Sequence, residues 1–301
     1  MKGRLMLLAT VLSAIAISVA TTVVLVLVEP TAPRSEAIRT GALSGGAVVA
    51  LYALWLNDRR RRVEEDRHQL EGVKVADERF ARSVELLGNE ADQVRIGALH
   101  SLVWLAGSNP RYKQTVLDIL CAYLRRPFDH PELRDEPAAP GAAAQSAPEA
   151  DREREVRFTA QRLIADVLPW GEDPDRRTYN LDLSGACLDH FRLEGRRIGR
   201  FTARRTRFHG VTRLGRMEAA KPVLFTDASF FGRLDLREAR LDGGISFQHT
   251  RFGDEVVLDK AAISTFLDIS TTAPTGQQGR MAVSPQTRID GTVEGWALDG
   301  V

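Results

Sequence analysis

The sequence predicts a chain of mixed class, with an N-terminal hairpin of two apolar helices, an α-helical middle region and a C-terminal β-solenoid. Two long apolar runs, Leu5–Val28 and 37–56, predict the hairpin. Helical spacing of apolar residues between 57 and 170 predicts the middle region. Across 181–271, apolar residues recur every five and then every eleven positions, which indicates one short unit stacked on itself.

The first apolar run has the length of a membrane span. Leu5–Val28 contains no charged residue, and at ~1.5 Å per residue a helix of this length reaches ~36 Å, enough for ~30 Å of hydrocarbon. A signal peptide is the alternative, because Lys2 and Arg4 precede the run and Ser18-Val-Ala20 has the small residues of a cleavage site. The run is longer than the apolar part of a usual signal peptide, so we favour the span.

The second run, 37–56, is a weaker span because it includes Arg39, which would reach towards the interface. Tyr52 and Trp55 lie near its far end, as interfacial aromatic residues do. Gly41 and Gly45 form a small-xxx-small pattern that allows helices to approach closely. The domain 1–56 is therefore predicted to be a transmembrane hairpin.

Charge predicts the orientation of the hairpin. The block Arg59–Arg62 directly follows the second run, whereas the loop 29–40 holds two acids and two arginines. Positive residues flanking a span stay in the cytoplasm. We therefore expect a multi-pass protein of the cell membrane with the bulk of the chain in the cytoplasm.

The middle region divides into charged and amphipathic parts. Residues 57–90 read as charged juxtamembrane helices, one leaving the membrane and a second carrying Phe80 and Val84. Residues 91–130 and 151–170 carry amphipathic helices that echo one another, as in HEAT-type pairs. Residues 131–150 are rich in Pro and Ala, with almost no bulky apolar residue, and are predicted to be a flexible linker.

The periodic segment, 178–272, predicts short extended pieces. Apolar or small residues lie two apart, so they point to one face, and Gly or Asp follows at a corner. Four pieces per turn would close a squared coil, with roughly four to five coils hydrogen-bonded as parallel strands. A chance-periodic β-sandwich is the alternative, which the unbroken register disfavours. The predicted repeat core comprises Leu183, Leu188, Leu193, Ile198, Phe208, Phe230, Leu236, Leu241, Phe247, Phe252, Leu258, Ile263 and Ile269. Residues 273–301 are left as a C-terminal tail.

The segments LDLSGACLDHFRLEG (181–195) and ASFFGRLDLREARLDGG (228–244) resemble pentapeptide-repeat proteins. In that family an A-(D/N)-L-x-x unit builds a right-handed quadrilateral β-helix, and the resemblance implies this fold for 178–272. The sequence departs from the family pattern at Arg196, which occupies a small inward slot, and at Phe201 and Ala203, which exchange large and small. We therefore expect distortion near 196–203 and 217–223.

The order of the domains carries a second resemblance. The segments RFARSVELLG (79–88) and VLDILCAYLRRP (116–127), placed between a two-span hairpin and a repeat domain, resemble a group of actinobacterial membrane-anchored pentapeptide-repeat proteins. The resemblance implies membrane anchoring and gives no activity.

Motifs of catalysis are missing from the sequence. It contains no GxSxG, no Walker lysine loop, no HExxH and no CxxC pair. The two cysteines, Cys121 and Cys187, read as buried thiols, and the six histidines show no metal-ligand spacing. We expect no catalytic, cofactor or metal site and no small-molecule substrate.

One charged cluster is a candidate partner surface. Nine arginines against a single acid, Glu194, lie between 192 and 216. The arginines expected in outward or corner slots are Arg197, Arg200, Arg204, Arg205, Arg207, Arg213 and Arg216. A dense basic band suits anionic lipid, nucleic acid or an acidic protein, and a solvated face is the alternative.

These observations favour a membrane-anchored scaffold that binds an unidentified protein partner and has no enzymatic activity. The alternative is a module that binds anionic lipid or nucleic acid through the arginine band. Some pentapeptide-repeat proteins are acidic rods that mimic DNA and bind a type II topoisomerase. The surplus of arginine and lysine over 181–271 disfavours that role here.

Overall fold

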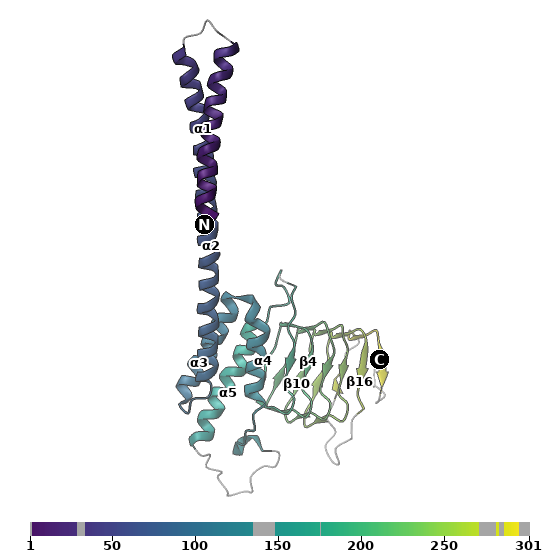
Figure 1. The fold of residues 1–301 in the computed structure, drawn as a ribbon. Coiled ribbons are helices and arrows are strands. Elements are labelled where there is room, and N and C mark those ends of the chain that lie inside the picture. Colours follow the sequence, from purple (N-terminus) through teal and green to yellow (C-terminus); the bar gives the residue numbers. More distant parts are fainter. Residues whose placement is uncertain are drawn as a thin grey trace. The chain divides into compact units, whose positions relative to one another are not determined.

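The computed structural model describes residues 2–28, 34–134, 148–174, 176–270, 281–282 and 286–294. The chain divides into two compact units, Met1–Asp77 and Glu78–Val301. Apolar helices form the N-terminal part, and helices followed by a parallel β-solenoid form the second unit, which confirms the predicted fold class (Figure 1).

Unit 1 holds two long helices, α1 (Lys2–Val28) and the first part of α2 (Arg34–Leu86). The helices touch at glycine: a Cβ on Gly41 would lie 2.6 Å from the carbonyl oxygen of Ser18. Most apolar side chains point away from this contact, so that Leu27 is 74 % and Leu54 66 % exposed. Two segments, Ala9–Val28 and Ile38–Arg61, are long and apolar enough to cross a membrane.

The charged segment after the second apolar run was expected to form separate helices, and this prediction is wrong. Helix α2 continues without a break from Arg34 to Leu86. The sequence between 57 and 86 offers no proline, and Gly72 lies inside the helix with open space around its Cα. A glycine within a helix costs only ~1 kcal/mol relative to alanine, so it does not stop one that is otherwise favourable.

Unit 2 begins with a small helical region. It consists of the end of α2, α3 (Asp92–Ser108), η1 (Pro110–Tyr112), α4 (Lys113–Leu124) and α5 (Pro148–Val167). Asn109 separates α3 from η1 in an extended conformation, as the residue before a proline prefers. The buried faces carry leucine, isoleucine and valine at helical spacing, and α5 packs on both α3 and α4.

The predicted linker is shorter than expected at both ends. Residues 131–133 form η2 (Pro131–Leu133), and Leu133 is buried. At the other end, α5 begins at Pro148, a residue suited to the first turn of a helix because its missing N–H needs no partner there. The rest of the predicted linker, 135–147, lies outside the described residues.

The solenoid is built from two- and three-residue strands that pair in parallel between successive coils. The strands are β1 (Leu181–Asp182), β2 (Cys187–Asp189), β3 (Arg197–Ile198), β4 (Phe201–Thr202), β5 (Arg207–His209), β6 (Thr212–Arg213), β7 (Glu218–Ala219), β8 (Val223–Leu224), β9 (Ser229–Phe230), β10 (Leu234–Asp235), β11 (Arg240–Leu241), β12 (Ile245–Ser246), β13 (Arg251–Phe252), β14 (Val256–Val257), β15 (Ala262–Ile263), β16 (Phe266–Asp268), β17 (Met281–Ala282), β18 (Arg288–Ile289) and β19 (Thr292–Glu294).

Four sheets make the four faces of the coil. They run β1-β4-β8-β12-β16-β19, β2-β5-β9-β13, β6-β10-β14-β17 and β3-β7-β11-β15-β18. We name each sheet by its first strand. The stack makes about four turns (Figure 1).

The interior of the solenoid is a column of apolar side chains. Every residue of the predicted repeat core is at most 6 % exposed. Residues one coil apart stack, with the rings of Phe208 and Phe230 parallel at 4.4 Å and those of Phe225 and Phe247 at 5.6 Å. The coil thus removes from water the side chains that alternate along each short strand.

The parallel register continues through both segments where distortion was expected. Strands β3 and β4 pair with β7 and β8, and only the corner 220–222 is longer than its counterpart one coil earlier. Phe201 fits because its ring lies edge-on to Phe225 at 5.4 Å. Arg196 fits because its guanidinium leaves the coil at the N-terminal end, where Nη1 donates a hydrogen bond to the carbonyl oxygen of Leu168 at 3.1 Å.

The predicted C-terminal tail contributes to the solenoid. Strands β17, β18 and β19 pair in parallel with β14, β15 and β16. The sequence period did not reveal them because Val256 pairs with Met281, a longer step than the one from Leu234 to Val256. Residues 271–280, which lie within this longer step, are outside the described part of the chain.

Candidate interaction surface

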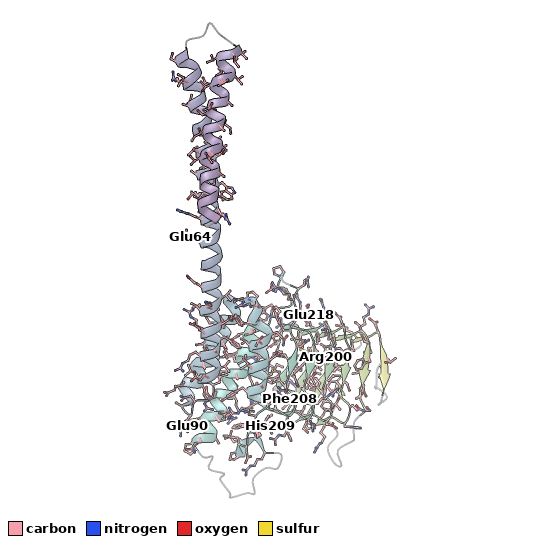
Figure 2. The ribbon with its side chains drawn as sticks, viewed as in Figure 1. Glu64, Glu90, Arg200, Phe208, His209 and Glu218 are labelled. Carbon is pink, nitrogen blue, oxygen red and sulfur yellow. The ribbon has the colours of Figure 1, made fainter. Side chains whose placement is uncertain are left out.

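The seven arginines of the predicted band lie on different faces of the solenoid. Arg197 is on the β3 sheet, Arg207 on the β2 sheet and Arg213 on the β6 sheet. The others occupy corners: Arg200 between β3 and β4 (Figure 2), Arg204 and Arg205 between β4 and β5, and Arg216 between β6 and β7. They encircle the first two coils and do not form one continuous patch.

Arg197 was expected to be exposed, and this prediction is wrong. Its side chain points out of the coil as expected, yet the residue is only 4 % exposed. The segment before the solenoid covers it: its guanidinium donates hydrogen bonds to the carbonyl oxygens of Asp173, at 3.2 Å, and Gly171. An outward slot in one coil therefore does not ensure contact with solvent, because another part of the chain can lie over it.

Several of the charges form columns of alternating sign. Glu218 pairs in register with Arg197 on one side and Arg240 on the other. The Glu218 carboxylate (Figure 2) lies 3.1 Å from Nε of Arg197 and 3.5 Å from Nη1 of Arg240. Opposite charges on neighbouring strands stabilise a sheet, so this column is explained by the stacking itself.

The corners carry further alternating columns, built on an uncommon backbone conformation. Non-glycine residues with φ between 51° and 58° recur at equivalent corners. Arg205 is followed one coil later by Asp227 and then His249, whose Nδ1 lies 3.5 Å from the Asp227 carboxylate. The second column holds Arg216, Glu238 and Lys260. Charged side chains suit these corners because they remain in water while the backbone turns.

Four exposed arginines of the band have no acidic partner. Among the residues that the structure describes, Arg200, Arg204, Arg205 and Arg213 have no carboxylate within salt-bridge distance. They belong to three different corners or faces. A flat anionic surface would therefore not meet all of them at once.

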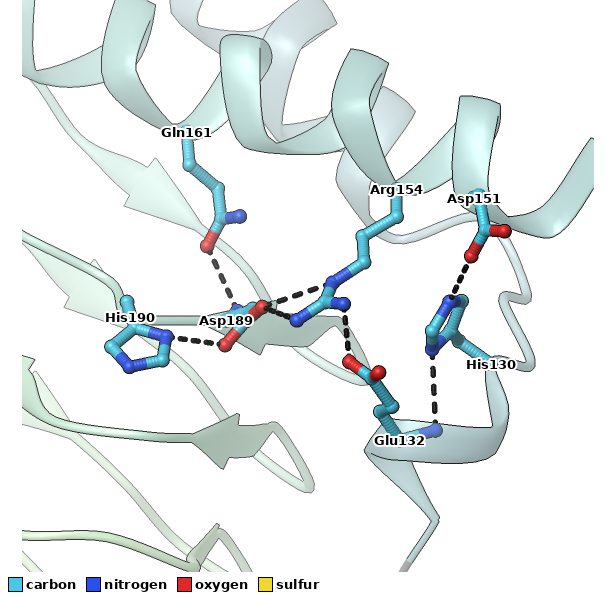
Figure 3. A network of polar contacts seen from close by, with 7 residues as sticks. All are labelled: His130, Glu132, Asp151, Arg154, Gln161, Asp189 and His190. Atoms are coloured by element: carbon cyan, nitrogen blue, oxygen red, sulfur yellow. Dashed lines mark hydrogen bonds and ion pairs between the residues drawn. The ribbon is translucent and has the colours of Figure 1, made fainter. Parts of the chain in front are cut away.

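The helical region closes the N-terminal end of the solenoid through polar contacts that the sequence did not reveal. Arg154 of α5 holds Asp189 of β2 through Nη2 at 2.6 Å and Nε at 3.1 Å (Figure 3). The same guanidinium reaches Glu132 of η2 at 2.5 Å. The side-chain oxygen of Gln161 accepts a hydrogen bond from the backbone N–H of Asp189 at 3.2 Å. One arginine thus joins three segments.

These bonds keep Asp189 ionised. Burial alone would raise the pKa of this carboxyl, but hydrogen bonds from Arg154 and His190 outweigh burial and hold the pKa below its usual value. His190 Nδ1 lies 2.6 Å from the carboxylate (Figure 3). Nearby, His130 lies 2.9 Å from Asp151 and accepts a hydrogen bond from the backbone N–H of Glu132. The network is a structural clamp between helix and coil.

A second set of contacts closes the other side of this end. Arg125, just after α4, pairs with Asp182 of β1 at 2.6 Å. Gln114 of α4 makes two hydrogen bonds of 2.9 Å with the backbone of Asn180. The first coil therefore offers its open edge to the helices rather than to solvent, which removes a template for edge-to-edge association.

A cleft of about 380 Å³ lies between α5 and the first two coils. Its lining is Phe158, Gln161, Arg162, Ala165, Asp166, Trp170, Asp189, His190, Arg192, Glu194, Arg196 and Arg216. Phe158 is 46 % and Trp170 55 % exposed, although both are large and apolar. The Arg196 guanidinium lies 3.6 Å from the centre of the Trp170 ring.

Gly195 explains how Trp170 approaches the coil. A Cβ on this glycine would lie 3.0 Å from the Trp170 ring, and its φ of 69° favours glycine independently. The backbone at Gly195 therefore contacts one part of the Trp170 ring, while more than half of the Trp170 surface stays exposed. Sequence analysis noted Arg196 only as a departure from the repeat and did not find Trp170, because the contact joins the repeat to the segment before it.

No group of three or more His, Cys, Asp or Glu among the described residues is positioned to hold a metal ion. Cys121 and Cys187 are buried thiols that form no disulfide, and burial raises the pKa of Cys121 to about 12. A thiol with this pKa is inert as a nucleophile at neutral pH.

Comparisons with known proteins add nothing to this geometry. No protein-family model, no curated protein and no solved structure matches the chain.

Proposed function

We propose that the chain is a membrane-anchored pentapeptide-repeat scaffold, without catalytic activity, that presents its second unit to a protein partner in the cytoplasm. The hairpin of α1 and the first part of α2 is the anchor. The helical region of unit 2, which we call the helical cap, and the solenoid together supply a rigid surface. Each coil is fixed to its neighbours by parallel hydrogen bonds and a packed core.

The observation that carries the proposal is the outward-facing apolar surface of unit 1. Side chains such as Leu12, Leu27 and Leu54 are more than 60 % exposed along helices that are otherwise nearly uncharged. In water such a surface is unfavourable by about 25 cal/mol per Å² of apolar area. In a bilayer the same surface meets lipid, and close approach at small residues such as Gly41 holds the helices together.

Orientation rests on the charges that follow the second apolar segment. Arg59, Arg60 and Arg61 are exposed on α2, and the Arg59 guanidinium lies 5.4 Å from the centre of the Trp55 ring. An interfacial tryptophan beside a basic block is typical of the cytoplasmic end of a span. The proposal therefore places both ends of the hairpin, and all of unit 2, in the cytoplasm.

The finer assignment to pentapeptide repeats rests on the size of the inward residues. The first inward slot holds Ala186, Ala228, Ala239, Thr250 and Ala261, all of them buried. The second slot mostly holds Leu, Phe or Ile, also buried. This alternation of small and large residues inside a four-faced coil is what the pentapeptide pattern requires.

A second candidate function has one observation in its favour. Arg200, Arg204 and Arg213 are exposed and lack acidic partners among the described residues, which suits binding of anionic lipid or nucleic acid. Their spread over several faces limits how many can meet one such surface. A salt series separates the two functions, because electrostatic binding weakens steeply with salt and a packed protein interface weakens less.

The anchor is tested by cysteine labelling in intact cells. Single cysteines replace Pro33 and Pro140, one in the predicted external loop and one in the predicted cytoplasmic part. An impermeant maleimide is expected to label position 33 and not position 140, while the buried Cys121 and Cys187 give little background. Labelling at 140 alone would overturn the orientation, and loss of the protein from membranes in alkaline carbonate would overturn the anchor.

The scaffold role is tested in native membranes. A photo-crosslinking residue is placed at exposed positions of the solenoid, and captured species are identified. We expect one protein to be captured reproducibly at low and at high salt. Capture of lipid or nucleic acid alone, lost at high salt, would favour the second candidate.

A further inference from the structure

The cleft between α5 and the first two coils carries positive charge that no acid among the described residues neutralises. Two of its three acids are already held. Asp189 is bound by Arg154, which lies outside the cleft lining, and Glu194 pairs with Arg216 at 3.1 Å. These two carboxylates therefore offer little further charge to the other arginines of the cleft.

The third acid, Asp166, interacts electrostatically with Arg196. Arg196 in turn stacks on the Trp170 ring and donates a hydrogen bond to the backbone carbonyl of Leu168. Within the described chain, Arg162 of α5 and Arg192 of the first coil remain without a carboxylate in salt-bridge range, and both are exposed. The cleft thus has two unpaired guanidinium groups, one on each wall.

The first coil adds a like-charge neighbour. Arg192 forms a parallel bridge with Arg213 of β6, so two exposed arginines stand side by side on adjacent coils. Like charges directly opposite on neighbouring strands are destabilising. The column Arg197, Glu218 and Arg240 on the β3 sheet, by contrast, alternates in sign. The pair Arg192 and Arg213 therefore adds a like charge beside the cleft instead of neutralising Arg192.

The same cleft carries two exposed aromatic residues. Phe158 lies on its α5 wall, and Trp170 lies at its end. Trp and Arg are the residue types most enriched among the energetically dominant positions of protein interfaces, and a carboxylate binds a guanidinium through two parallel hydrogen bonds. A ligand that satisfies both features carries carboxylates next to a large apolar side chain.

A neighbouring groove indicates an extended ligand. Trp170 also lines a second, larger space of about 950 Å³ that follows the strands of the β3 sheet. Its lining carries both signs of charge, with the basic residues Arg176, Arg216, Arg240 and Lys260 and the acidic residues Glu172, Glu218 and Glu238. Two clefts that meet at one tryptophan suit a length of polypeptide better than a compact small molecule.

We propose that the cleft between α5 and the first two coils is the partner-binding site, and that it takes an acidic peptide segment bearing at least one aromatic or aliphatic anchor residue. Carboxylates of the peptide pair with Arg162 and Arg192, and the anchor residue packs on Phe158 and Trp170. This inference rests on the proposed scaffold function, whose partner class it specifies.

The test selects short random peptides, displayed on phage, on the full-length protein in lipid nanodiscs, after depletion on empty nanodiscs. Binding of the selected peptides is then measured by fluorescence anisotropy. One variant is Arg162→Gln with Arg192→Gln. The matched control is Arg200→Gln with Arg204→Gln, which removes the same charge from exposed corners outside the cleft.

Selected peptides are expected to combine Asp or Glu with Trp, Phe or Leu. Their affinity should fall at least about tenfold in the cleft variant, and less than about twofold in the control. Selected peptides without acids, equal losses in both variants, or no enrichment at all would each overturn the proposal. The membrane labelling and photo-crosslinking experiments do not depend on the cleft, so crosslinks mapping elsewhere would leave the scaffold role standing.

Discussion

Unit 1 and the solenoid use the same kinds of side chain in opposite ways. In unit 1 the leucines and valines point outward, and small residues such as Gly41 and Ser18 meet between the helices. In the solenoid, phenylalanine and leucine fill the interior, while arginine, aspartate and glutamate cover the faces. Figure 1 shows the backbone of each region, helices in unit 1 and stacked strands in the solenoid.

If unit 1 is the membrane anchor proposed above, the difference teaches that each region is matched to a different solvent. Burying apolar surface drives folding only where the surroundings are water. In lipid that drive is missing, and helices associate through close packing of small residues instead. A substitution should therefore have opposite consequences in the two regions: loss of a large apolar side chain should damage the solenoid, and gain of one at the helix contact should damage the hairpin.

The largest effect is expected inside the solenoid. Phe225 is fully buried and its ring touches those of Phe201, Phe208, Phe230 and Phe247. Phe225→Ala should lower the free energy of unfolding by about 3–5 kcal/mol through lost contacts and a residual cavity. Thermal or denaturant unfolding of the full chain in nanodiscs measures it.

The matched control for this change is the exposed Gln248. Gln248→Ala should alter the free energy of unfolding by no more than about 0.5 kcal/mol. Equal, small effects at positions 225 and 248 would contradict the arrangement of inward and outward residues.

The next largest effect is expected at the clamp between the helical cap and the first coil. Asp189→Asn removes the charge held by Arg154 (Figure 3) and should cost about 1.5–3 kcal/mol at neutral pH, as for hydrogen bonds to charged groups. Unfolding of both proteins across a pH series measures the difference.

The pH series has a defined sign. The pKa of Asp189 lies below its usual value, so the carboxylate contributes stability above the unfolded pKa of about 3.9. As pH falls through the folded pKa, both states become protonated and this contribution is lost. The difference between wild type and Asp189→Asn should therefore shrink below about pH 4. A difference that grew on acidification would be inconsistent with the clamp.

A comparable or smaller effect is expected in the hairpin. Gly41→Leu would place a side chain against the backbone of Ser18 and push α1 from α2, at a cost of about 1–3 kcal/mol as for other overpacked contacts. Gly46 has nothing within 4 Å of its expected Cβ, so Gly46→Leu is the matched control. Steric trapping in bicelles measures helix association, and equal effects at 41 and 46 would argue against the helix contact.

The smallest effect is expected on the outer faces. Arg200→Gln with Arg204→Gln should change the free energy of unfolding by no more than about 0.5 kcal/mol, because neither guanidinium has an acidic partner among the described residues. If this variant lost binding to anionic vesicles, measured by sedimentation at low salt, the result would favour the second candidate function, binding of anionic lipid or nucleic acid.

The sequence predicted the solenoid because its signal is local and repeated. Residues such as Leu241 and Phe252 follow the small residues Ala239 and Thr250 by two positions, and the inward face follows from strand geometry alone. It did not predict β17 to β19, because a longer step between coils breaks the period although the pairing continues. It also did not predict that α2 is one helix, since the change from apolar to charged composition does not by itself interrupt helical hydrogen bonds.

The candidate site was predictable only in its composition. The arginines between 192 and 216 stand out in the sequence, yet their distribution over several faces and corners depends on where each coil turns. Burial of Arg197, the stacking of Arg196 on Trp170 and the clamp at Asp189 each join residues distant in the chain. No spacing rule reports such contacts, because they form only when the helical cap meets the first coil.

By itself, the sequence determined the class of each region: apolar helices, an amphipathic helical middle and a β-solenoid with its inward residues. These structural classes follow from periodicity and composition, which can be read from short stretches of the sequence. The tertiary structure alone decided which arginines face solvent and which are neutralised. It alone showed a cleft beside α5 with Trp170 and two guanidinium groups that have no carboxylate partner among the described residues. The physical reason is that charge and exposure depend on neighbours in space, and those neighbours are set by how the helical cap and the coils pack.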